Sequence, residues 1–544
     1  MEKISGNLVD IISGRIRPVE ILIKDHKIHS VEDCESEYDL YILPGFIDSH
    51  VHIESTMMTP LQFSRFAVSK GTVAIVTDVH EIANVLGERG IGFMQKSARK
   101  SALKIFFTVP SCVPATTFDR SGATLDAGKV SELLKTGRFV GLSEMMNYPG
   151  VLHKDPDVLK KLEAAAIMHL PADGHAPGLK GEELHTYISY GINTDHECTT
   201  LDEAIEKIKE GMIISIREGS SAKNYEALKE LIRLYPEQIM FCTDDSHPDD
   251  LLKSGHIDKI VRRAIADGYD LFNVLKAASY NTVCHYRLPV GLLRINDPAD
   301  FICVDNLKDF RILRNYINGE CVYNAETHKA EPFTDPVRTI NNFHAKPITP
   351  EQLVLYTSGL LTSIKVIDGQ LWTEKLETET PNETKVFKPD TMHDILKIVY
   401  YNRYQKAEPQ VATISGFGLQ RGAIASCVGH DSHNILAVGC TDKEIADAVN
   451  LIIQNKGGIA VVDKDNQYIL SLPIGGIMSP KDCETLAGEW GKLHLKYNEM
   501  GGKLIAPFMT LAFMSLIVIP KLKIGEKGLF DAEKFCFLSE NQQL

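Results

Sequence analysis

The feature that most constrains the fold is a series of short apolar segments that alternate with stretches of helical periodicity between about residues 44 and 288. Each segment has the length of a buried strand, and strands that alternate with helices are typical of βαβ units. Eight such units predict an α/β fold, a closed (β/α)₈ barrel. The candidate strands are LPGFIDSHVHIE, TVAIVTDVH, KIFFTVPSCV, FVGLSEMM, MHLPADGH, GINTDHE, MIISIREG and IMFCTDD.

Short alternating segments flank the predicted barrel on both sides. The N-terminal flank contains LVDII, EILIKD and KIHSVE, and the pattern resumes with VGLLRINDPADFICVDN and RILRNYINGECVYN. The period of two predicts one small β domain built from residues 1–43 and 289–335. A connector that contains Pro and Asn (331–350) precedes a second α/β region with glycine-rich turns, predicted as a C-terminal domain at 345–544.

Composition and charge exclude several classes of protein. The 44% hydrophobic and 24% charged residues are near globular averages, which argues against disorder. A formal charge of −14 without a basic stripe argues against a nucleic-acid partner. The N-terminus has no signal-peptide pattern, and the strongest apolar run (506–520) is too short to span a bilayer. Eleven cysteines without a C-x-x-C fit a reducing compartment. We therefore expect a cytoplasmic protein with no membrane partner.

Ionisable residues stand at or near the C-terminal ends of seven of the eight candidate strands. A barrel brings these ends together at one mouth, and buried charges without partners are costly. His50 and His52 lie on one face of the first strand, since residues i and i+2 point the same way, so both can bind one metal. An H-x-H pair alone is weak evidence. Four companions on separate strands strengthen it: Glu144, His175, His196 and Asp244.

Six such side chains predict a site for two divalent ions, with Glu144 as the bridge. Histidine and carboxylate ligands without thiolates suit zinc, iron or manganese and do not choose among them. Two ions that share a water would lower its pKa and create a hydroxide nucleophile. The predicted chemistry is therefore hydrolysis.

Several consecutive blocks resemble the adenine deaminase branch of the amidohydrolase superfamily. They are PGFIDSHVHIES, DVHEIANV, SEMMN, DGHAPG, TDHE, REGS and CTDD in the predicted barrel, and CVGHDSHNI, LPIGGIMS and PFMTLAFMSLIVIPKLKI near the C-terminus. The resemblance implies an enzyme of purine salvage with two iron or manganese ions, zinc being an alternative, that converts adenine and water to hypoxanthine and ammonia. A homo-oligomer, dimer or larger, is expected. One departure is DVHEI, where the branch has Pro before the His.

The resemblance also implies roles for single residues. It assigns metal binding to His50, His52, Glu144, His175, His196 and Asp244. Glu144 occupies the place on the fourth strand where many relatives use a carboxylated lysine. Asp244 matches the aspartate of the eighth strand that binds metal and handles the proton of the nucleophilic water.

Proton transfer to and from a purine needs a carboxyl or imidazole group within hydrogen-bond reach. Asp244, Glu218 and Glu197 are the candidates, beside the predicted bridge Glu144. Glu218 could instead form an ion pair with Arg217 or another barrel residue. Glu197 directly follows a predicted ligand, so in a continuing strand it would point to the opposite side, and the alternative for it is a role in supporting the ligands or a place on the outer face.

Five further residues are candidate substrate contacts. His80 and Glu81 end the second strand candidate, and His430, Asp431 and His433 belong to a GHDSH segment in the C-terminal region. The alternative for the first pair is a brace for the ligands. The alternatives for the GHDSH segment are another metal site or an Asx-type turn.

Two rival functions remain. One is hydrolysis of a cyclic amide or N-acyl group by another kind of amidohydrolase, and Glu144 and the C-terminal blocks argue against it. The other is a catalytically inactive scaffold, which would be expected to have lost ligands. Other motifs fail: the glycines of GFGLQRG are spaced one residue too far for a dinucleotide fingerprint, and neither HEIAN nor HECTT completes H-E-x-x-H.

Overall fold

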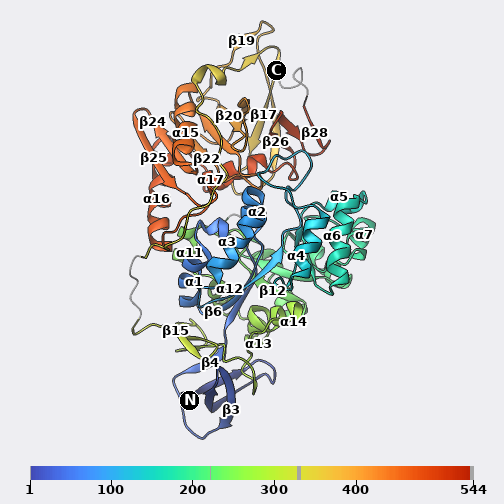
Figure 1. The fold of residues 1–544 in the computed structure, drawn as a ribbon, viewed down its shortest axis with the longest axis vertical. Helices are drawn as coiled ribbons and strands as arrows, with labels where there is room; N and C mark the ends of the chain where they lie inside the picture. Colours follow the sequence, from blue (N-terminus) through green and yellow to red (C-terminus); the bar gives the residue numbers. More distant parts are fainter. Residues whose placement is uncertain (1, 221, 328–332, 539–544) are drawn as a thin grey trace. The chain divides into compact units, whose positions relative to one another are not determined.

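The computed structural model describes residues 2–220, 222–327 and 333–538 (Figure 1). The chain forms two compact units. Unit 1 comprises Met1–Val79, Met94–Ser111 and Asp126–Asp335, and unit 2 comprises His80–Phe93, Cys112–Leu125 and Pro336–Leu544. The three predicted domains do not coincide with these units, so their boundaries stay predictions.

Unit 1 contains a closed barrel of parallel strands. Strands β5 to β9 form one sheet and β10 to β12 another, and all neighbouring strands are parallel. Parallel bridges from Ala172 to Ile192 and from Val51 to Asp244 join the two sheets at both seams. The predicted (β/α)₈ barrel is therefore confirmed. Its strands are β5 (Phe46–Val51), β6 (Thr72–Thr77), β7 (Lys104–Val109), β8 (Gly141–Met145), β9 (Ala172–Gly174), β10 (Thr194–Asp195), β11 (Ile213–Arg217) and β12 (Ile239–Cys242).

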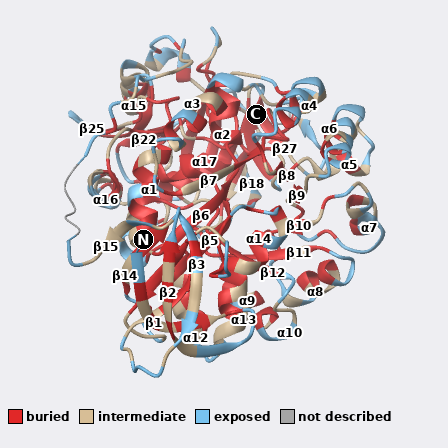
Figure 2. Ribbon diagram, turned by 60° about the horizontal axis from the view of Figure 1, so that its bottom comes forward, coloured by how far each residue is buried: buried red, intermediate tan, exposed pale blue. Residues whose placement is uncertain are grey.

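Barrel strands such as β6 and β11 are rich in apolar, β-branched residues because helices cover a parallel sheet from outside. Strands β5, β6 and β8 are buried along their whole length (Figure 2). Several helices begin at a capping side chain, as at Thr59, Asp126 and Thr200. The main helices of this unit are α1 (Pro60–Ser69), α4 (Ala127–Lys135), α6 (Pro156–Ile167), α7 (Gly181–Ser189), α8 (Leu201–Lys209), α11 (Pro248–Ser254), α12 (Ile257–Ala266) and α14 (Asn281–Tyr286). Helix α3 (Glu88–Ala98) runs from unit 2 into unit 1.

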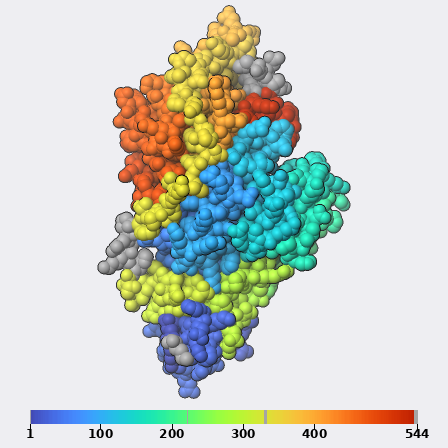
Figure 3. Space-filling view, viewed as in Figure 1, coloured from blue at the N-terminus to red at the C-terminus, as the bar shows by residue number. Residues whose placement is uncertain are grey.

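A seven-stranded sheet in unit 1 takes strands from both flanks of the barrel sequence. Its order is β15-β14-β13-β4-β1-β2-β3. The N-terminal strands are β1 (Glu2–Asp10), β2 (Arg15–Lys24), β3 (Lys27–Asp33) and β4 (Tyr41–Pro44), and the later ones are β13 (Phe301–Val304), β14 (Ile312–Ile317) and β15 (Glu320–Asn324). Val19, Ile42 and Phe301 lie in its apolar core. Figure 3 shows the blue N-terminal residues beside the yellow-green ones of the second flank.

Unit 2 is built around an eight-stranded sheet of order β18-β17-β21-β20-β23-β22-β24-β25. Its strands are β17 (Leu360–Val366), β18 (Thr373–Glu379), β20 (Ile395–Tyr401), β21 (Gln410–Ser415), β22 (Ala423–Ser426), β23 (Ile435–Gly439), β24 (Gly458–Asp463) and β25 (Asn466–Ser471). Helix α15 (Asp442–Asn455) packs on this sheet, with Ile445 and Val449 in a core shared with Val399 and Ala437. The unit also contains helices α2 (His80–Leu86), α16 (Cys483–Glu499) and α17 (Pro507–Ala512) and a small sheet of β26 (Leu522–Gly525), β27 (Gly528–Asp531) and β28 (Cys536–Phe537).

The strongest apolar run of the sequence is largely buried in unit 2. It forms α17 and a short 3₁₀ turn, Phe513–Ser515, whose residues are all buried. Within the described residues, none of the helices combines the length and the apolar character needed to cross a membrane.

Candidate metal centre

The end of strand β5 brings two imidazoles together. His50 lies in β5 and His52 follows its last residue, and both side chains are buried. Their Nε2 atoms are 3.2 Å apart. The bridge between Val51 and Asp244 joins this strand end to the residues after β12, so the ends of the first and eighth strands are adjacent. The predicted pairing of the two histidines on one site is thus possible in the folded chain.

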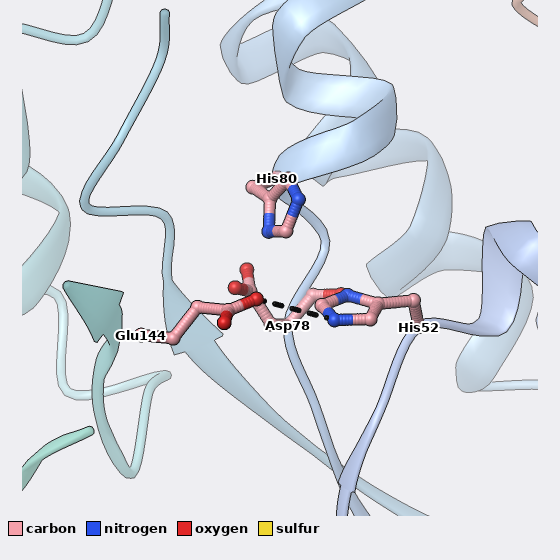
Figure 4. A group of neighbouring side chains, drawn as sticks. All are labelled: His52, Asp78, His80 and Glu144. Carbon is pink, nitrogen blue, oxygen red and sulfur yellow. Dashed lines mark hydrogen bonds and ion pairs between the residues drawn. The ribbon is translucent and has the colours of Figure 1, made fainter. Parts of the chain in front are cut away.

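Two buried carboxylates face this histidine pair. Glu144 Oε1 lies 3.2 Å from His52 Nε2 and 3.8 Å from His50 Nε2. Asp244 Oδ1 lies 3.1 Å from His52 Nε2 and 3.6 Å from His50 Nε2. Figure 4 shows Glu144 and His52 pointing toward one another, with Asp78 from the segment after β6. Four side chains from three separate strand ends thus converge on one point.

The second oxygen of Glu144 faces a different pair of histidines. Glu144 Oε2 lies 2.7 Å from His175 Nδ1 and 3.3 Å from His196 Nε2. The ring of His196 also stacks on that of His50, with centroids 4.3 Å apart. The two oxygens of Glu144 therefore face two different pairs of histidines.

The donor set fits divalent metal ions. Two atoms bound to one ion at about 2.1 Å lie roughly 3 to 3.5 Å apart in tetrahedral or octahedral geometry, and most of the donor separations fall in or near that range. Among the groups of donor atoms that are close enough to hold an ion are His50, His196 and Asp244, and Glu144, His175 and His196. Burial alone would raise the pKa of Glu144, but the adjacent His175, His196 and His52 lower it well below its usual value. An ionised carboxylate is the form that binds a metal.

Arg217, the last residue of β11, connects two carboxylates of the centre. Its guanidinium pairs with both oxygens of Glu197, and its Nη1 lies 2.6 Å from Asp244 Oδ2. Glu197 Oε1 in turn lies 3.4 Å from His196 Nε2 and 3.7 Å from His175 Nδ1. The expectation that Glu197 points away from the ligands is wrong, because β10 ends at Asp195 and Glu197 lies beyond the strand.

Glu218 makes a different contact from those of the cluster. Its carboxylate lies 3.3 Å from Nη1 of Arg263 on helix α12. The alternative of an ion pair with Arg217 is wrong, since the guanidinium of Arg217 is used by Glu197 and Asp244. The other alternative, a pair with another barrel residue, agrees with this contact. Asp244 and Glu197 therefore lie beside the histidines of the candidate metal centre, whereas Glu218 contacts Arg263.

The five candidate substrate contacts all belong to unit 2 and lie together. Glu81 Oε1 is 2.5 Å from His430 Nδ1, and Glu81 Oε2 pairs with His433 Nε2. His80 Nε2 lies 3.5 Å from Glu81 Oε1 and 3.9 Å from Asp431 Oδ1. All five side chains are buried. The GHDSH segment is thus held to the start of α2 by one carboxylate, and its role stays a prediction.

Comparison with known proteins decides the family. Residues 41–322 match the amidohydrolase family, and residues 370–536 match the adenine deaminase C-terminal domain. The chain is 49% identical to an adenine deaminase of Sulfurovum sp. over 537 residues, which cover 98% of this chain and 99% of the relative. It is 49% identical to one from Methanosarcina acetivorans and 46% identical to one from Parabacteroides distasonis, with at least 98% of both chains covered in each case. The chain belongs to the adenine deaminase family.

In this adenine deaminase family member, a buried lysine supports two of the histidines. Lys207 Nζ donates to Asp195 Oδ2 at 2.6 Å, to Glu203 Oε1 at 2.9 Å and to the carbonyl of Ala176 at 2.7 Å. Asp195 directly precedes His196, and Ala176 directly follows His175. Our sequence analysis missed Lys207, although its spacing of four from Glu203 on a helix is a recognisable ion-pair signal. It also missed the role of Arg217 as a partner of Asp244.

Proposed function

We propose that this protein catalyses the hydrolytic deamination of adenine to hypoxanthine and ammonia at the cluster of unit 1. Family membership supports the reaction class and the substrate. The observation that carries the proposal is the position of Glu144, whose two oxygens face His52 and the pair of His175 and His196. A chain that had lost its catalytic role would not be expected to keep all of these ligands buried and convergent.

We propose that the cluster holds two divalent ions. His50, His52 and Asp244 would hold one, His175 and His196 the other, with Glu144 between them. Iron or manganese is the metal that the family resemblance favours, and the donor set also accepts zinc. When bound, the ions would supply Lewis acidity that lowers the pKa of a water to near neutrality.

In the proposed reaction, Asp244 moves protons. It accepts one proton from the attacking water as the water oxygen bonds to C6 of the purine, and this proton passes to N1 of the ring. Asp244 then accepts the proton of the C6 hydroxyl as the C6–O double bond forms and delivers it to the amine, which leaves as ammonia when the C6–N bond breaks. The lowered pKa of Asp244 suits an ionised acceptor: burial would raise it, but Arg217, His50 and His52 hold it well below the usual value. N1 of the ring gains a proton in the same sequence. Glu197 lies close enough to the histidines to take part in it.

The proposed mechanism assigns no step to Glu218, whose carboxylate contacts Arg263, and the catalytic role predicted for it stays a prediction. The assignment of the five buried residues of unit 2, His80, Glu81, His430, Asp431 and His433, to substrate binding stays a prediction. So do a homo-oligomeric state and a cytoplasmic location.

Ammonia release tests the proposal. Metal-loaded protein is incubated with adenine, adenosine, hydantoin and N-acetylglucosamine 6-phosphate, and ammonia or the hydrolysis product is measured. We expect adenine to be deaminated with a kcat/KM at least tenfold above that for adenosine, and the other two compounds to remain unchanged. Equal turnover of adenosine, or turnover of hydantoin or the N-acyl sugar alone, would contradict the proposal.

A further inference from the structure

We infer that Arg217 is a positioning residue that holds the carboxylate of Asp244 in the orientation that proton transfer needs. The inference rests on the proposed function, in which Asp244 accepts the proton of the water. It concerns a residue that contacts neither the water nor the purine in that mechanism, and acts through Asp244.

The two oxygens of Asp244 are divided between two kinds of partner. Oδ2 lies 2.6 Å from Arg217 Nη1, whereas Oδ1 lies 3.1 Å from His52 Nε2. A short contact to a guanidinium fixes one oxygen and thereby sets the plane of the whole carboxylate. Only Oδ1 then remains directed at the histidines that would hold a metal and its water.

The backbone of Asp244 is the second observation that supports a fixed side-chain orientation. Its φ of 51° lies in the left-handed region, which is uncommon for a residue other than glycine. The amide of Asp244 donates to the carbonyl of His50 at 3.0 Å, so the main chain is bonded to the end of β5. The ion pair with Arg217 adds a fixed point at the far end of the side chain.

Arg217 is itself held rigidly. Its guanidinium forms a two-point contact with Glu197, in which Nη2 lies 3.1 Å from Oε2. Its backbone amide donates to Asn224 Oδ1 at 2.7 Å. The side-chain amide of Asn224 donates to the carbonyl of His196 at 3.0 Å. Arg217 therefore connects the turn after β10 with Asp244, the aspartate that follows β12.

Charge neutralisation alone does not explain this residue. A lysine would supply the same charge, but its single ammonium cannot reproduce the planar fork that contacts Glu197 and Asp244 together. A positioning role predicts that Arg217→Lys is defective, whereas a role in charge balance predicts that it is not.

The test compares Arg217→Lys and Arg217→Met with a matched control, Arg263→Lys. Arg263 is also paired with a carboxylate after β11, but its partners are Glu218 and Glu226. We expect Arg217→Lys to retain its metals and a KM within about threefold of wild type, with kcat lowered by about 10², the cost of misplacing a reacting group by roughly 1 Å. Arg217→Met should lose at least as much, and Arg263→Lys should match wild type.

A double variant tests whether Arg217 acts through Asp244. In the Asp244→Asn background, Arg217→Lys should lower kcat by less than about threefold, because residues that act as a unit are not additive. A further loss of about 10² there would overturn the inference. Near-native kcat for Arg217→Lys, or loss of metal from that variant, would overturn it as well.

A readout without substrate separates this inference from the proposed function. In protein loaded with Co(II), the visible absorption reports the ligand geometry, and we expect Arg217→Lys to change it while Arg263→Lys does not. If wild type failed to deaminate adenine, the proposed function would fail, and the Co(II) spectra would still decide whether Arg217 sets the geometry of Asp244. An unchanged spectrum in Arg217→Lys would overturn the inference.

Discussion

The Nε2 atoms of His50 and His52 lie 3.2 Å apart, each within 4 Å of carboxylate oxygens of Glu144 and Asp244. A separation of about 3.2 Å between two ring nitrogens is what a shared ion produces when each bond is about 2.1 Å long. Hydrogen bonding alone would satisfy each of these Nε2 atoms with one partner. Here four acceptor or donor groups crowd the same point, which favours a cation at the centre.

Metal removal should abolish activity reversibly. We expect metal analysis of active protein to approach two ions per chain, and a chelator to remove both activity and metal. Fe(II) or Mn(II) should restore activity, and the melting temperature should fall without metal because a ligand that binds only the folded state stabilises it. Full activity with a single tightly held ion would contradict the binuclear site.

Asp244→Asn keeps nearly the same volume but cannot accept a proton as a carboxylate does. We expect kcat to fall by about 10² to 10⁴, as is typical for the loss of an acid or base group. Glu218→Gln is the matched control. Glu218 follows the neighbouring strand, β11, and its carboxylate contacts Arg263, so kcat of this variant should stay within a few-fold of wild type. Steady-state kinetics on metal-loaded variants measure both. A near-native kcat for Asp244→Asn together with loss of activity in Glu218→Gln would show that Glu218, and not Asp244, transfers the proton.

The sequence contains enough information for the barrel but not for the contacts among its strand ends. Each strand such as TVAIVT shows its own apolar pattern, so the architecture and the convergence of His50, His52, Glu144 and Asp244 could be predicted. Which charged residue pairs with which depends on where each strand ends. Strand β10 stops at Asp195, and this short length turns Glu197 toward the histidines, against the period-two expectation.

The partners of the buried basic side chains Arg217 and Lys207 could not be predicted from the sequence either. The guanidinium of Arg217 contacts Asp244, which follows the next strand, and Lys207 contacts Asp195 from a helix. The first contact joins residues 27 positions apart and the second joins residues 12 positions apart, so neither has the spacing of three or four that marks a pair on one helix. The contacts of Glu81 with His430 and His433 in unit 2 are also of this kind, since they join residues about 350 positions apart.

Lys207→Met should destabilise unit 1 and loosen the metal centre. The ammonium is fully buried between Asp195 and Glu203, so its removal leaves two buried carboxylates without their cation. Breaking such a group costs about 3 to 5 kcal/mol. We expect a lower melting temperature and weaker metal retention, measured by calorimetry and metal analysis after dialysis. Lys209→Met, on the exposed side of the same helix, should match wild type, and equal behaviour of the two variants would contradict the proposed support of His175 and His196.

Lys523 should make the stability of unit 2 depend on pH. Its Nζ is buried and donates to the carbonyls of Leu371 and Phe513, and burial lowers its pKa to about 7. In the unfolded chain the pKa is near 10.5, so between pH 7 and 10.5 the unfolded state binds more protons than the folded state. The free energy of unfolding therefore rises with pH through this window.

Comparison with Lys523→Met isolates this effect. Relative to the variant, wild type should gain about 2 kcal/mol of stability between pH 7 and pH 9, since one unit of pKa shift corresponds to about 1.4 kcal/mol. Calorimetry of both proteins at pH 7, 8 and 9 measures the change in their difference in melting temperature. Lys521→Met, at an exposed position two residues earlier, serves as the control and should show no such trend. A difference between wild type and Lys523→Met that stays constant from pH 7 to 9 would mean that Lys523 remains protonated in the folded protein.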